Sequence, residues 1–192
     1  LFLVTFCHHF DNGLCGHARS IYAPFHRMLD QSMRLDEGFT ESGRAVLDRL
    51  LGLDGSLPPG AMRTLVDLKH MSLAGRWEVY QRVEAHNRDH PEDPIPLVVS
   101  HFAASGRPEP IPELIETTTD TDELYATTDG LFNPWTLNFS DEEILRIHES
   151  GGLLGLILDQ RVLASGPELR RVRATRESAR KSPDPEFEQN WA

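Results

Sequence analysis

The chain of 192 residues, with 39% hydrophobic and 26% charged side chains, has the length and composition of one globular domain. Its net charge of −11 argues against a nucleic-acid partner, because general binding to DNA or RNA requires a basic surface. No apolar run approaches the roughly 18 residues of a membrane span. Two cysteines, Cys7 and Cys15, are too few for a disulfide scaffold.

The first part of the chain predicts a strand followed by a helix. The apolar run Leu1–Phe6 has the composition of a buried strand. Apolar residues then recur at helical spacing between Val46 and Leu51. Thr40 is placed to cap the start of this helix, and Gly52 stands where it would end.

The same order repeats twice further along the chain. A second strand is predicted at Thr64–His70 and a third at Ile95–His101. The helix between them has apolar residues at Leu73, Trp77, Tyr80 and Val83. Ser140 and Glu143 form a capping-box pattern at the start of another helix, and Gly152–Leu158 is the fourth predicted strand.

Strands that alternate with helices indicate an α/β fold with a parallel sheet, either open and doubly wound or closed as a barrel. We expect residues 1–166 to form this domain, with 107–130 as a loop or insertion. Residues 167–192 have the composition of a polar, basic helix followed by a tail, and we assign them no function.

Histidines stand at the ends of three of the four predicted strands, at His8, His70 and His101. Ligands collect at the carboxyl ends of parallel strands, and imidazole is the commonest protein ligand for zinc. The pattern therefore predicts that His70 and His101 share a metal ion.

Alternation along the second strand places Lys69 on the face opposite His70, so we interpret Lys69 as structural. His9 is out of phase with His8 and is expected to be solvated. We expect the same of the remaining histidines, His17, His26, His86, His90 and His148. The chain has no nucleophile elbow, no phosphate-binding loop and no helical His-Glu-x-x-His motif.

Four parts of the chain resemble, in order, the membrane dipeptidase (renal dipeptidase-type) family of metallopeptidases. They are VTFCHHFDNGLCGH, then GFTESGRAVLDRLL with TLVDLKHMS, then PLVVSHFAAS, and finally NFSDEEILRIHESGGLLGL. Together they cover most of residues 1–160. The resemblance implies a partial (β/α)8 TIM barrel of the metal-dependent hydrolase type, with about four of its eight β/α units in this chain.

The same resemblance implies two divalent metal ions, with zinc the expected metal, and hydrolysis of a dipeptide or a related amide. His70 and His101 match the two histidine ligands of the second metal, and His8 matches a histidine that contacts the substrate. The implied partner is thus a small peptide-like molecule.

Several residues of the family's site have no counterpart in the chain. Its His-x-Asp pair and bridging glutamate precede the matched region, and its proton-transferring aspartate would follow Ala192. We therefore interpret the chain as an internal part of a barrel whose catalytic residues lie outside it, completed by further sequence or by a second chain, as in a homodimer. Two histidines make a weak zinc site, so we expect the isolated chain to bind zinc poorly and to lack peptidase activity.

Leu137 stands where the family has an arginine that binds the substrate carboxylate, and Arg161 is a candidate replacement. This difference leaves two alternatives open: hydrolysis of a non-dipeptide amide or lactone, or an inactive barrel that serves as a binding protein. The compartment is also open, since two cysteines agree with a bacterial cytoplasm and with a periplasm.

Overall fold

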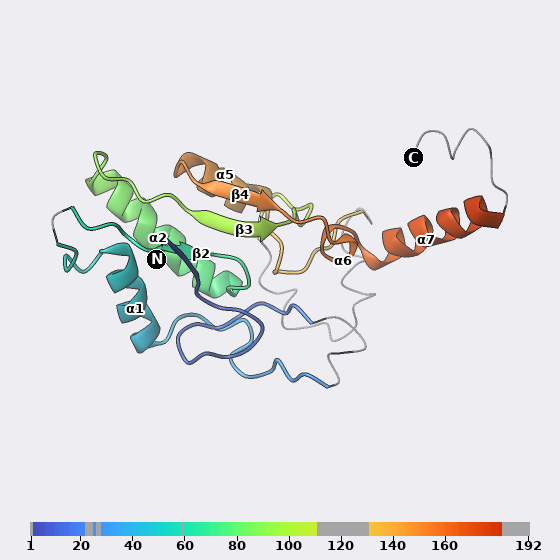
Figure 1. Cartoon of the computed structure of the whole chain (residues 1–192), viewed down its shortest axis with the longest axis horizontal. Helices are drawn as coiled ribbons and strands as arrows, with labels where there is room; N and C mark the ends of the chain where they lie inside the picture. The colour runs from blue at the N-terminus through green and yellow to red at the C-terminus, as the bar shows by residue number, and fades with distance from the viewer. Residues whose placement is uncertain (1, 22–24, 26–27, 59, 111–130, 182–192) are drawn as a thin grey trace.

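The computed structural model describes residues 2–21, 25, 28–58, 60–110 and 131–181, except for the side chains of 161, 179 and 181. In this part of the chain, helices alternate with the strands of one four-stranded parallel sheet (Figure 1). The strands lie side by side in chain order: β1 (Leu3–Thr5), β2 (Leu65–Asp67), β3 (Val98–Phe102) and β4 (Leu153–Leu156). The predicted α/β fold with a parallel sheet is confirmed, and the arrangement is compatible with a partial β/α fold.

Local capping interactions fix the starts of the first two long helices. Helix α1 (Glu41–Leu51) begins at Thr40, whose side chain accepts a hydrogen bond from the Gly43 amide, and it ends at Gly52 with a φ of 72°. Both predicted ends are confirmed. Helix α2 (Leu73–Asp89) begins at Ser72, whose side chain accepts from the Gly75 amide. Since Ser72 follows β2 closely, the turn between them is short.

The later helices follow the predicted order. Helix α5 (Asp141–Glu149) begins with the predicted capping box between Ser140 and Glu143. After β4 come the short helix α6 (Gln160–Leu163) and helix α7 (Gly166–Lys181), which extends away from the sheet (Figure 1). No helix in the described ranges is both long and apolar enough to cross a bilayer.

Parts of two predicted segments lie outside the described residues. Of the predicted loop at 107–130, only residues 107–110 are described, and of the tail only the helical part to Lys181.

The main core lies between the sheet and helices α1, α2 and α5. It includes Leu47, Leu51, Val66, Val79, Tyr80, Val83, Val98, Val99 and Ile147. Strand β4 packs closely against β3, since a Cβ atom at Gly155 would come within 2.0 Å of the Ser100 carbonyl oxygen. This packing holds β4 beside the part of β3 that carries His101.

Candidate metal centre

A buried carboxylate joins the carboxyl ends of the first three strands. Asp67, at the end of β2, is fully buried and accepts hydrogen bonds from Thr5 Oγ1 of β1 at 3.1 Å and from the Ser100 amide and hydroxyl of β3 at 2.9 and 2.6 Å. Its Oδ1 atom also accepts from the Lys69 amide at 3.1 Å. Asp67 therefore holds the ends of β1 and β2 at a fixed spacing from the part of β3 that carries Ser100 and His101.

The same interactions define the tautomer of His101. The single hydroxyl proton of Ser100 is donated to Asp67 Oδ2, so Ser100 Oγ accepts from His101 Nδ1 at 2.7 Å. The proton of the neutral His101 ring is consequently on Nδ1. Its Nε2 atom keeps a lone pair that can accept a proton or bind a metal ion.

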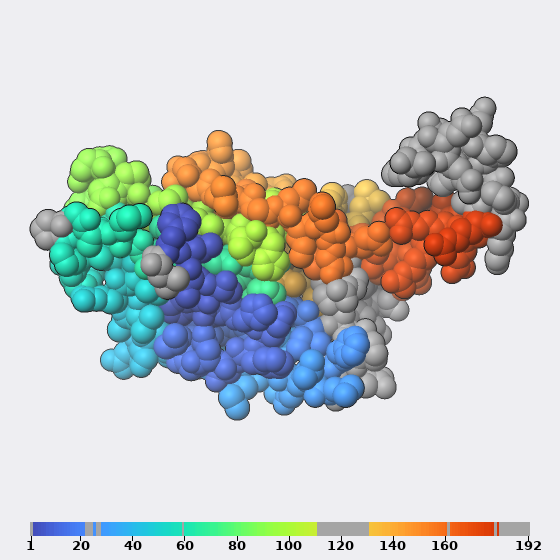
Figure 2. All heavy atoms as spheres, in the orientation of Figure 1, coloured from blue at the N-terminus to red at the C-terminus, as the bar shows by residue number. Residues whose placement is uncertain are grey.

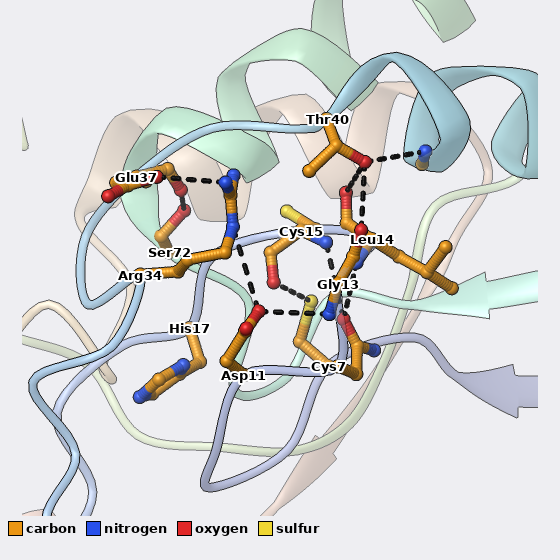
Figure 3. A network of polar contacts seen from close by, with 12 residues as sticks. Cys7, Asp11, Gly13, Leu14, Cys15, His17, Arg34, Glu37, Thr40 and Ser72 are labelled. Atoms are coloured by element: carbon orange, nitrogen blue, oxygen red, sulfur yellow. Dashed lines mark hydrogen bonds and ion pairs between the residues drawn. The ribbon is translucent and has the colours of Figure 1, made fainter.

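The segment that carries His8 and His9 turns back immediately after β1. Asn12 makes this turn, because its Nδ2 donates to the Phe6 carbonyl at 2.6 Å and its Oδ1 accepts from the Leu14 amide at 3.0 Å. Cys7 Sγ donates to the Cys15 carbonyl across the turn. Figure 3 shows these contacts continuing to Thr40, the cap of α1. The turn is thus anchored to the start of a helix.

Backbone hydrogen bonds place this segment beside the end of β2. The Ala18 amide donates to the His70 carbonyl at 2.8 Å, and the Ser72 amide donates to the Gly16 carbonyl at 3.1 Å. The space-filling view shows the N-terminal segment, in blue, lying beside the green part of the chain on this face (Figure 2). Residues far apart in sequence are therefore brought to one site.

At this site the imidazole rings of four histidines gather. The ring centroid of His8 lies 3.9 Å from that of His9 and 4.4 Å from that of His70. The rings of His9 and His70 are 4.8 Å apart, and those of His70 and His101 are 5.2 Å apart. His8, His9 and His70 each offer a ligand atom within 4.8 Å of the others, a group that does not include His101.

His9 is oriented by a network of side chains. Its Nδ1 atom lies 2.6 Å from Ser20 Oγ, and Ser20 Oγ accepts a hydrogen bond from Gln31 Nε2 at 3.0 Å. Gln31 also donates to the His9 carbonyl at 2.5 Å and accepts from the Ser20 amide at 3.2 Å. These contacts hold the ring in place and leave its Nε2 atom for another partner.

His70 adopts a backbone conformation that is uncommon for a non-glycine residue, with a φ of 67°. Its side chain is buried, with 5% exposure, and its Nδ1 atom has no hydrogen-bond partner. An orphaned nitrogen in a strained, buried residue is costly to the fold, and such costs concentrate at functional sites.

The surroundings of His9, His70 and His101 favour their neutral rings. Burial, followed by the positive charge of Lys69 and the neighbouring imidazoles, lowers the pKa of His70 to about 2. Burial also lowers the pKa of His9 and of His101, with His8 and Lys69 respectively adding to the effect. Neutral imidazole is the form that binds metal ions, so these three rings do not have to lose a proton before they bind a cation at neutral pH.

The structure corrects two expectations about single histidines. The phase argument that separated His9 from His8 is wrong, because β1 ends at Thr5 and the residues after it are not in a strand. His17 is not solvated either: it is fully buried, and its Nε2 contacts the Gln31 carbonyl at 3.2 Å. Two consecutive histidines directly after an apolar run were the sequence signal for His9.

Other predicted residues lie as follows. Lys69 is buried, donates to the Leu137 carbonyl at 3.1 Å and has a pKa lowered to about 7 by burial and by Arg76. Leu137 is itself buried, so its side chain faces the interior. The backbone of Arg161 is in α6, while its side chain lies outside the described part, as does the whole of His26.

Comparisons with known proteins identify no relative. No family model, no curated protein and no solved structure matches the chain.

Proposed function

We propose that the protein is a metal-dependent hydrolase that acts on a dipeptide or a related amide. The observation that carries this proposal is the meeting of His8, His9, His70 and His101 at the carboxyl end of a parallel sheet. Binding and catalytic groups gather at this end in β/α proteins. The sequence resemblance to membrane dipeptidases supports the same reaction.

The donor set fits a divalent metal ion of the zinc type. The described residues offer three imidazoles with ligand atoms within 4.8 Å of each other, and His70 Nδ1 is buried without a partner. Catalytic zinc sites commonly use three protein ligands. A metal ion held there would polarise the carbonyl of a substrate and make water a stronger nucleophile. The second ion that the resemblance implies is proposed on that resemblance alone.

His101 is placed to transfer protons, and the exposed side of the histidine cluster gives a substrate access to it. His101 Nε2 carries the lone pair, since Nδ1 donates to Ser100, and it can take a proton from water or give one to a leaving amine. Asp67, behind Ser100, stabilises the ring as it becomes positive. His8 is exposed and His101 is half-buried, so a small substrate can reach this side of the cluster.

The class of substrate is inferred from Leu137, which stands where the membrane dipeptidase family has an arginine. The side chain of Leu137 is apolar as well as buried, so it offers no donor to a substrate carboxylate in the way the family's arginine does. A substrate without a free carboxylate, such as a blocked amide or a lactone, is therefore the second candidate.

The test is a hydrolysis assay on the protein as its gene encodes it, loaded with zinc. Ala-Ala and Gly-Leu would be compared with blocked amides and lactones. We expect hydrolysis of at least one class, its loss on chelation, and its loss in His70→Gln. The control His148→Gln changes an exposed histidine of α5 and should keep full activity. Absence of any hydrolysis, or undiminished hydrolysis in His70→Gln, would refute the proposal.

A further inference from the structure

We infer that His8, His9 and His70 form a single three-imidazole site for one divalent transition-metal ion, with His101 outside it. This inference refines the metal site of the proposed function and rests on that proposal for its catalytic meaning. It differs from the site that the resemblance implies, where His70 and His101 are the ligands and His8 contacts the substrate. In the refined site His8 becomes a ligand, and His101 takes the position that faces the substrate.

The donor atoms of the three histidines lie close enough together to bind one ion. Each of these three histidines offers a nitrogen within 4.8 Å of the other two. Zinc–nitrogen bonds are about 2.0–2.1 Å long, so two nitrogens on one tetrahedral ion are roughly 3.3 Å apart. Each pair of nitrogens, now at most 4.8 Å apart, would have to approach by no more than about 1.5 Å to reach that separation. His8 is exposed and can make most of this adjustment.

The ring of His9 is held in place by a hydrogen bond at the nitrogen that would face away from the metal ion. A histidine that binds a metal almost always has its other ring nitrogen held by a hydrogen bond. His9 has this arrangement, with Nδ1 beside Ser20 Oγ and Gln31 fixing both residues. A merely solvated histidine would not need an oriented serine and glutamine behind its ring.

His70 is the buried member of the three histidines. His70 is 5% exposed, and its Nδ1 atom has no hydrogen-bond partner. A cation bound by the cluster would give the buried ring a polar partner that neither water nor a side chain of the described residues supplies at Nδ1. His101, by contrast, already has a complete chain of hydrogen bonds through Ser100 to Asp67.

Competition between the chain and a chromophoric chelator for Zn²⁺ tests this inference. The assay contains no substrate, so it measures metal binding separately from hydrolysis. We expect one zinc ion per chain. His9→Gln and His8→Gln should each weaken zinc binding by more than about tenfold. Loss of a residue that only supports a ligand typically weakens metal binding by about 10- to 100-fold, and loss of a ligand itself should cost at least as much. His101→Gln and the control His148→Gln should leave the affinity within a factor of about two.

Loss of zinc binding can be distinguished from loss of folding in these variants. Circular dichroism shows whether each variant folds, and His8 is exposed, so its replacement carries little risk to the fold. Zinc binding that is lost in His101→Gln but survives His9→Gln would overturn the inference in favour of the His70–His101 pair. Zinc binding that survives all four substitutions would also overturn it, with Cys7 and Cys15 as the alternative ligands. A chain that binds zinc as expected but hydrolyses nothing would contradict only the proposed function.

Discussion

His9 Nδ1 lies 2.6 Å from Ser20 Oγ, although eleven positions separate the two residues in the chain. Ser20 is buried, and it is the only side chain in the described part of the protein that is hydrogen-bonded to the His9 ring. The orientation of His9, and through it the shape of the histidine cluster, therefore depends on this serine.

Replacing Ser20 by alanine should weaken zinc binding without unfolding the protein. The His9 ring would lose its hydrogen bond and rotate more freely, and loss of such supporting contacts costs about 10- to 100-fold in metal affinity. Chelator competition measures the change, and Ser42→Ala, at an exposed position of α1, is the matched control. Equal affinities for the two variants would show that Ser20 does not orient a ligand.

Replacing Asp67 by asparagine should lower the free energy of unfolding by about 2–4 kcal/mol, because its buried carboxylate accepts hydrogen bonds from Thr5, Lys69 and Ser100. An amide presents two donors in place of one acceptor, so donors of Thr5 or Ser100 would face it unpaired. Urea denaturation gives the difference, with the exposed Asp89→Asn as control. A loss no larger than that of the control would contradict the role of Asp67.

Asp36 should make stability depend on pH. Burial raises the pKa of its carboxyl from an ordinary value of about 4 to about 6, and its Oδ1 atom has no hydrogen-bond partner. Between these values the folded state holds more protons than the unfolded state, so the free energy of unfolding falls as the pH rises from about 4 to about 6. The fall attributable to Asp36 is at most about 3 kcal/mol.

Asp36→Asn should flatten this part of the pH profile. Asparagine tolerates the positive φ of 61° at this position, so the backbone strain is unchanged. Urea midpoints of both proteins at several pH values between 4 and 7 measure the difference. Parallel profiles would mean that Asp36 titrates normally.

The buried ion pair between α2 and α5 should matter more to stability than the exposed pairs. Arg76 Nε donates to Glu143 Oε1 at 2.7 Å, and both side chains are 1% exposed. Arg76→Leu would leave the Glu143 charge buried without its partner, at a cost of about 3–5 kcal/mol. Arg82→Gln, which removes a partly exposed pair with Asp48, should cost less than about 1 kcal/mol. Similar losses in thermal unfolding would contradict this ranking.

The helix ends were predictable from the sequence because their causes are local. Thr40 and Gly52 bound α1, and Ser140 with Glu143 starts α5, as their spacing predicts. The alternation of apolar runs and helical patterns also predicted a parallel sheet, but not the order of its strands. The helix ends depend on residues within a few positions of each other.

The strand ends were less predictable because tertiary contacts determine them. The run Thr64–His70 suggested a strand to its last residue, whereas β2 ends at Asp67 and His70 has a left-handed backbone. Hydrogen bonds of Asp67 to β1 and β3 and pairing of Ala18 with His70 cause this early end. His9 was missed for the same reason, since the two-residue period fails where the strand stops.

X-ray absorption at the zinc edge of the zinc-loaded protein counts the ligands most directly. The account predicts three imidazole nitrogens at about 2.0–2.1 Å and no sulfur. Fewer than three imidazoles, or a zinc–sulfur distance of about 2.3 Å from the cysteines, would contradict it.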